Sequence, residues 1–176
     1  MYKKGAIWIS VVLYMGLGII VLSMVLAVGL PTVQKMKDKY ILTQTKDLML
    51  ALDGNIRTVY QEGPGSQRVI KLKIGKGEFK IDQDNEVISW ILETSAVYTQ
   101  PEIQIIEGSL QILTEETNVK GNYEISFTLD YDSAALALDL TYQTQQSIFG
   151  TSTLSILNKG INDQGKTEIS VTKLWK

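Results

Sequence analysis

Carboxylates are the side chains in this sequence that are numerous enough to suggest acid–base or metal chemistry. The chain has 176 residues with no His and no Cys, which excludes imidazole catalysis, thiol nucleophiles, disulfide bonds and His/Cys zinc sites. Twelve acidic residues lie between positions 82 and 139, and Lys120 is the one basic residue in that interval. Two such carboxylates at the right separation are what a glycosidase uses.

The spacing of these acids does not favour a catalytic pair. Most of them fall at turn signals or on the polar phase of alternating segments, where a carboxylate is solvated. Nothing in the sequence brings two of them together. We therefore predict no catalytic residue and no cofactor site, and we expect that the protein is not an enzyme.

The densest acidic group is Asp82, Asp84 and Glu86, spaced two residues apart. Calcium binds six to eight oxygens from loops of this kind. The group lacks the longer pattern and terminal Glu of an EF-hand, and Asp and Asn are common turn formers. A charged hairpin turn is the favoured interpretation and a weak calcium site is the alternative; no metal ligand is assigned.

Charge is divided unevenly along the chain, although 17 basic and 19 acidic residues leave a net charge of only −2. The first 46 residues hold six basic residues and one acidic residue, for a net charge of +5. The remainder holds eleven basic and eighteen acidic residues, for a net charge of −7. An acidic body is a poor partner for phosphates, so no nucleic acid is expected.

The basic part of the chain contains an apolar segment long enough to cross a membrane. Residues 5–34 are 30 consecutive residues without a charge, and about 20 helical residues span the hydrocarbon core. Basic residues stand at both ends, Lys3 and Lys4 before the segment and Lys35, Lys37 and Lys39 after it. The positive-inside rule therefore does not fix the orientation.

Three interpretations of this segment compete. Ala27 and Gly29 offer the small residues of a secretory cleavage site, but the preceding apolar stretch exceeds the roughly 7–15 residues typical of a signal peptide. A plain signal anchor, which stays in the bilayer and holds an exterior domain, is the second interpretation. The third starts from the residues that precede the segment.

Lys3-Lys4-Gly5-Ala6-Ile7, followed at once by the apolar run, resembles the class III signal of type IV prepilins and archaellins, most closely the archaeal members. The resemblance implies a cytoplasmic leader, residues 1–5, and cleavage between Gly5 and Ala6 by a prepilin peptidase. A glycine before the scissile bond lets extended backbone enter the peptidase without a side-chain clash. It also implies a membrane assembly machinery as a partner.

One position departs from the pattern of many pilins. They carry Glu at the fifth mature residue, where it is thought to meet the terminal amine of a neighbouring subunit, and this chain has Ser10 there. A serine avoids a buried unpaired carboxylate but forgoes the contact. A minor or accessory subunit is therefore as compatible with the sequence as the main subunit.

The apolar run continues into an amphipathic pattern, which predicts one helix over residues 6–60. Residues 6–34 are its apolar part and residues 35–60 its amphipathic part, with a kink or local melting expected near Pro31. Such a helix measures roughly 80 Å. The apolar residues predicted to pack on the body are Val33, Met36, Tyr40, Ile41, Leu48, Leu52, Ile56 and Val59.

Residues 61–66 contain two glycines and Pro64 and predict a connector. From residue 67 to 176 the period changes to two, which predicts an antiparallel β-sandwich of about 7–9 strands. Gly75-Lys76-Gly77 and residues 82–85 are predicted turns, and Trp90 is predicted to lie in the core. The fold class is thus α+β, a long N-terminal helix followed by a β-sandwich.

These features predict a structural subunit of a type IV pilus-like or archaellum-like surface filament. It would be held in the membrane as a precursor and would polymerise with copies of itself or with other pilin-like subunits through its apolar helix. The β domain would then face the exterior. The alternative is a single-pass membrane protein whose exterior β domain binds a ligand or partner without polymerising.

Overall fold

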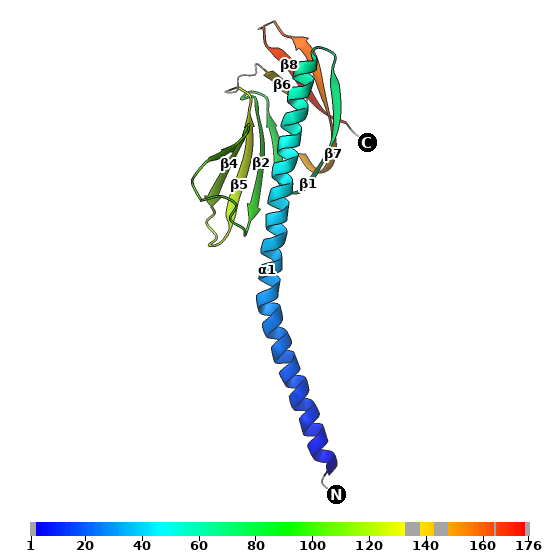
Figure 1. Ribbon diagram of the computed structural model, residues 1–176, viewed down its shortest axis with the longest axis vertical. Coiled ribbons are helices and arrows are strands. Elements are labelled where there is room, and N and C mark those ends of the chain that lie inside the picture. Colours follow the sequence, from blue (N-terminus) through cyan, green and yellow to red (C-terminus); the bar gives the residue numbers. More distant parts are fainter. Residues whose placement is uncertain (1–2, 133–137, 143–147, 164, 175–176) are drawn as a thin grey trace. The chain divides into compact units, whose positions relative to one another are not determined.

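The computed structural model describes residues 3–132, 138–142, 148–163 and 165–174, with side chains described outside residues 3–7, 138–142 and 149. The chain forms two compact units, Met1–Lys37 and Asp38–Lys176. The first unit is helical, and the second contains the rest of the helix and all the strands. Figure 1 shows the order of these elements along the chain.

The helix α1 spans Lys3–Glu62, 60 residues, and ends within two residues of the predicted position. Pro31 lies inside it, and the backbone stays helical on both sides, so there is no melted segment near residues 27–31. Proline removes one amide donor from the helix. One turn of the same region is supported by the Thr32 hydroxyl, which donates to the Val28 carbonyl at 2.9 Å. A bend at Pro31 stays a prediction.

Eight strands follow the helix and belong to one hydrogen-bonded sheet with the order β3-β4-β5-β2-β1-β7-β8-β6. They are β1 Gln67–Asp82, β2 Val87–Thr94, β3 Ile105–Glu107, β4 Leu110–Glu116, β5 Tyr123–Asp130, β6 Leu138–Tyr142, β7 Ile148–Ile161 and β8 Thr167–Leu174. Neighbours are antiparallel except β6 and β8, which run parallel. The predicted α+β fold and strand number are confirmed.

The core of the second unit lies between this sheet and the C-terminal half of α1. Figure 1 shows this part of α1 with β2, β4 and β5 on one side and β7 on the other. Its buried residues include Leu42 and Ile56 of the helix, Trp90 of β2, Phe127 of β5 and Ile156 of β7. All eight strands are joined edge to edge in one sheet, and the helix residues pack against its apolar face.

The buried face of α1 differs in part from the predicted one. Leu52, Ile56 and Val59 are buried as predicted, and Leu42 and Met49 join them. Val33, Met36 and Tyr40, which were predicted to pack on the body, are 49%, 68% and 69% exposed. The helix has two apolar stripes on different sides, and periodicity alone does not tell which of them the body covers.

The predicted turn at Gly75-Lys76-Gly77 is wrong, because β1 continues through these residues. The pairing of β1 with β7 shifts register between Ile74 and Phe79, which marks a bulge instead of a reversal. Gly77 has a φ of +86°, and a Cβ built on it would lie 2.3 Å from the carbonyl oxygen of Ile91. Gly77 thus allows a close approach of β1 and β2, and neither glycine ends the strand.

Two other predictions about the sheet are confirmed. The reversal between β1 and β2 lies at residues 83–86, which overlaps the predicted turn. Trp90 is 1% exposed. Its ring packs edge-to-face on that of Phe79, with the two ring centroids 5.8 Å apart. Its Nε1 donates a hydrogen bond to the Lys76 carbonyl at 3.0 Å. This bond ties β2 to the bulge of β1.

Candidate functional site

The apolar part of α1 is the most unusual surface in the described chain. Every large apolar side chain between Trp8 and Leu30 is exposed, from 48% at Leu26 to 76% at Trp8. Soluble monomers rarely expose apolar patches of more than a few hundred Å². A surface of this length and composition is stabilised by a non-aqueous environment such as lipid or other helices.

Among the residues that the structure describes, α1 is the one helix long and apolar enough to cross a membrane. None of its most apolar window is buried, whereas the core helix of a soluble protein is mostly buried. An N-terminal signal sequence passes the same test of length and composition.

The predicted cleavage residues lie at the very start of α1. The helical backbone begins at Lys3 and includes Gly5 and Ala6. The first turn contains no acidic residue, whereas Lys3 and Lys4 place positive charge at the positive end of the helix dipole. Gly5 further lowers the helix propensity. The helix is therefore weakly stabilised at this end.

Asp38 is the first polar contact between α1 and the sheet-bearing part of the second unit. It is 3% exposed, and its Oδ2 accepts hydrogen bonds from the Ser95 amide at 3.0 Å and hydroxyl at 2.7 Å. Lys76 Nζ lies 3.5 Å from Oδ1. Burial acts to raise the pKa of Asp38, but the Ser95 bonds and the Lys76 charge outweigh it, so the pKa is lowered from 3.8.

Asp53 is the second such contact, four helical turns further along. Its Oδ1 accepts a bond from the Tyr131 hydroxyl at 3.0 Å, and its Oδ2 accepts bonds from Ser109 at 2.6 Å and Arg57 Nε at 2.8 Å. Burial, with the charge of Asp53 adding to it, raises the pKa of Tyr131 well above 10.0. Ser109, Tyr131 and Arg57 all donate hydrogen bonds to this carboxylate, so together they satisfy a buried charge.

Lys46 connects α1 to the edge strand β3. Its Nζ lies 2.9 Å from Glu107 Oε2, and this bond, with a smaller contribution from Tyr98, raises the pKa of Lys46. Glu107 is the last residue of a strand that has only three residues. The ion pair therefore holds a short edge strand that has little sheet hydrogen bonding of its own.

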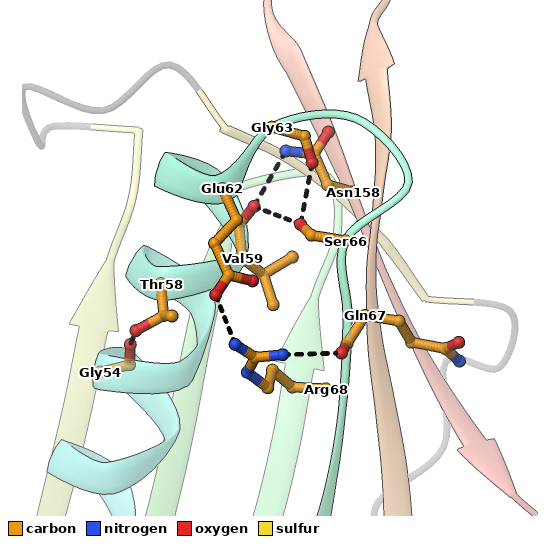
Figure 2. Close-up of polar contacts among 9 residues, drawn as sticks. All are labelled: Gly54, Thr58, Val59, Glu62, Gly63, Ser66, Gln67, Arg68 and Asn158. Carbon is orange, nitrogen blue, oxygen red and sulfur yellow. Dashed lines mark hydrogen bonds and ion pairs between the residues drawn. The ribbon is translucent and has the colours of Figure 1, made fainter.

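The C-terminus of α1 is capped by residues of the connector and of β7. Figure 2 shows Asn158 Nδ2 and the Ser66 hydroxyl meeting the Val59 carbonyl, at 3.1 Å and 2.7 Å. Glu62 forms an ion pair with Arg68 just beyond. The last carbonyls of a helix lack intrahelical partners. Side chains from the connector and from β7 therefore donate hydrogen bonds to this end of α1 and fix it on the sheet.

The acidic turn is held together by its own hydrogen bonds. Asp82 Oδ1 accepts bonds from the amides of Asp84 and Asn85, each at 3.1 Å, and Oδ2 accepts one from Asn85 Nδ2 at 2.7 Å. The Asn85 bonds lower the pKa of Asp82. Glu86 turns away to Lys166 Nζ, 2.9 Å distant. This geometry is that of the predicted hairpin turn. Among the residues that the structure describes, no three acidic side chains converge as metal ligands do.

Asp38 and Asp53 are the positions that sequence reasoning missed. An acid on an apolar helix face has no visible partner in the sequence, because Ser95 and Tyr131 lie 57 and 78 residues away. The signal that could have found them is helical spacing, since both fall on the face of Leu42, Met49 and Ile56.

Comparisons of the chain with protein-family models, with curated proteins and with solved structures found no match. The function is therefore argued from the residues and geometry described above.

Proposed function

We propose that this chain is a structural subunit, main or minor, of a type IV pilus-like or archaellum-like surface filament, with the archaeal members as the closest resemblance. The observation that carries the proposal is the exposed apolar part of α1, preceded by Lys3-Lys4-Gly5-Ala6 and followed by a β domain with its own core. Lipid covers this helix before assembly, and helices of other subunits replace the lipid in the filament.

The anchoring of the helix on the β domain supports the same function. A subunit that transmits tension along a filament needs its core helix fixed to its surface domain. In the second unit, Asp38, Lys46 and Asp53 bond α1 to residues that follow or belong to different strands, in addition to the apolar contacts of the core.

The alternative is a single-pass membrane protein whose β domain binds a ligand or partner without polymerising. The exposed apolar helix supports anchoring as well as polymerisation. Removal of residues 1–5 separates the two, because a plain signal anchor retains its N-terminus.

Processing is tested with two substitutions of one residue. In cells that contain an active prepilin peptidase, we expect the chain to begin at Ala6, as measured by mass spectrometry of the intact protein. Gly5→Val places a branched side chain beside the scissile bond and should leave most of the chain uncut, whereas the control Gly5→Ala keeps a small residue and should be processed. An intact Met1 in the unsubstituted chain contradicts the proposal.

A further inference from the structure

Three glutamates form a row across the sheet. Glu93 of β2 lies opposite Glu124 of β5, which lies opposite Glu115 of β4. Neighbouring strands are about 4.8 Å apart, and like charges directly opposite one another destabilise a sheet. Among the ion pairs of the described residues none includes these glutamates. The row therefore costs the single chain stability that a cationic partner would restore.

The same side of the sheet is apolar next to this row. Ile91 and Leu113 lie at the next outward positions, both opposite Ser126. All three side chains are half-buried, and they point away from the core that contains Trp90 and Phe127. We call Ile91, Leu113, Glu93, Glu115 and Glu124 the glutamate face. Its chemistry fits a partner that offers apolar side chains beside positive charges.

Such a surface exists on α1 of this chain. Val33, Met36 and Tyr40 are spaced i, i+3, i+7 and are exposed by 49%, 68% and 69%. Lys37 follows Val33 by four residues and Lys39 follows Met36 by three, so both are helical neighbours of these apolar residues. Both lysines are exposed and absent from the ion pairs of the described residues. We call these five residues the lysine stripe.

We propose that the glutamate face of one copy binds the lysine stripe of a second copy. This inference rests on the proposed filament function and names the contact between subunits. The two surfaces are complementary in both charge and apolar character. The lysine stripe lies in the part of the chain with a net charge of +5, and the glutamate face lies in the part with a net charge of −7. Contacts between two different surfaces do not pair up in a two-fold dimer and generate rings or open helical filaments, of which the filament is the form that the proposed function requires.

The contact is tested by cross-linking full-length chains, which contain no native Cys. One chain carries Met36→Cys and a differently tagged chain carries Leu113→Cys, and the two are produced in the same cells. A short bis-maleimide should join them into a species with both tags. Val69→Cys, on an exposed residue of β1, replaces Leu113→Cys in the control and should give no such species with Met36→Cys.

Charge reversal tests whether the ion pairs carry the contact. The triple change Glu93→Lys, Glu115→Lys and Glu124→Lys in the Leu113→Cys chain should lower the cross-linked yield by at least about tenfold. Lys37→Glu with Lys39→Glu in the Met36→Cys chain should do the same. Both sets together should restore most of the yield, which also shows that the changed chains fold.

The outcomes separate this contact from the proposed function. Filaments that form without the Met36–Leu113 cross-link overturn the contact and leave the filament function standing. A cross-link in membranes of cells that yield no filaments supports the contact and overturns the function. A yield that is unchanged by charge reversal overturns the contact. Lys37→Glu with Lys39→Glu can also abolish membrane binding while the cross-linked yield stays unchanged. That result assigns these lysines to lipid headgroups and overturns the contact between copies.

Discussion

Asp38 and Asp53 fix the register of α1 on the sheet. Apolar burial is non-directional, so the stripe of Leu42, Met49 and Ile56 would tolerate small shifts of the helix along its axis. Hydrogen bonds are directional, and each aspartate is bonded to residues far away in the sequence, Asp38 to Ser95 and Asp53 to Tyr131. The two acids lie near opposite ends of the part of α1 that contributes to the core.

Asp53→Ala is predicted to lower the free energy of unfolding by about 2–4 kcal/mol, because it leaves the Tyr131 hydroxyl and Arg57 without their buried acceptor. The measurement is chemical unfolding of the full chain in detergent, followed by near-ultraviolet circular dichroism. Asp47→Ala, at an exposed position of the same helix, is the control and should change the value by less than about 0.5 kcal/mol. Equal losses for the two variants would contradict this role of Asp53.

The lowered pKa of Asp38 predicts that the stability of the second unit depends on pH. Its pKa in the folded chain is lowered from 3.8, so its contribution is present above pH 3.8 and is lost as the pH falls through the lower folded value. Asp38→Asn should be less stable than the unsubstituted chain by about 1–2 kcal/mol at pH 7. The difference should shrink below pH 3.8. Unfolding measured from pH 7 to pH 2 tests this, and a difference that stays constant over that range would show that the Asp38 charge contributes nothing.

At the scale of elements, periodicity predicted the helix, the change to strands after residue 66 and the number of strands. Tyr123–Asp130 and Val87–Thr94 are strands because their residues alternate between apolar and polar. Periodicity did not predict the partner of each face. Val33, Met36 and Tyr40 show the same helical spacing as Leu52 and Ile56, and only the tertiary structure distinguishes the covered stripe from the uncovered one.

The bulge in β1 was missed for a related physical reason. Glycine pairs are common in turns and also occur where two backbones approach closely, and sequence alone does not separate the two uses. Here the Trp90 indole bonds to the carbonyl of Lys76, between the two glycines. The parallel pairing of β6 with β8 was also not predicted, since it joins segments that are not consecutive in the chain.

Gly77→Ala is predicted to destabilise the second unit by about 2–4 kcal/mol, because a side chain at positive φ is strained and the new Cβ meets the Ile91 carbonyl. Gly75→Ala is the matched control in the same bulge, since a Cβ there meets nothing within 4 Å. It should be neutral or stabilising by up to about 1 kcal/mol. Comparable effects of the two substitutions in chemical unfolding would contradict the close-approach explanation.

At the scale of the whole molecule, the chain combines a helix segment that needs an apolar environment with a β domain that has its own core. Composition and the apolar run predicted this division, because 30 uncharged residues stand before a strongly acidic body. The candidate contact between copies was not predictable in the same way. It requires knowing that Glu93, Glu115 and Glu124 occupy one row, which depends on strand order and register.

Shearing of cells that produce the chain tests whether it polymerises through its apolar helix. We expect the chain to leave the cells in a filament fraction that sediments after shearing, with Ala6 as its first residue. The matched variant Gly5→Val should stay with the membranes. Recovery of the unsubstituted chain only in the membrane fraction, with Met1 intact, would show that it does not polymerise and would favour the single-pass anchored domain.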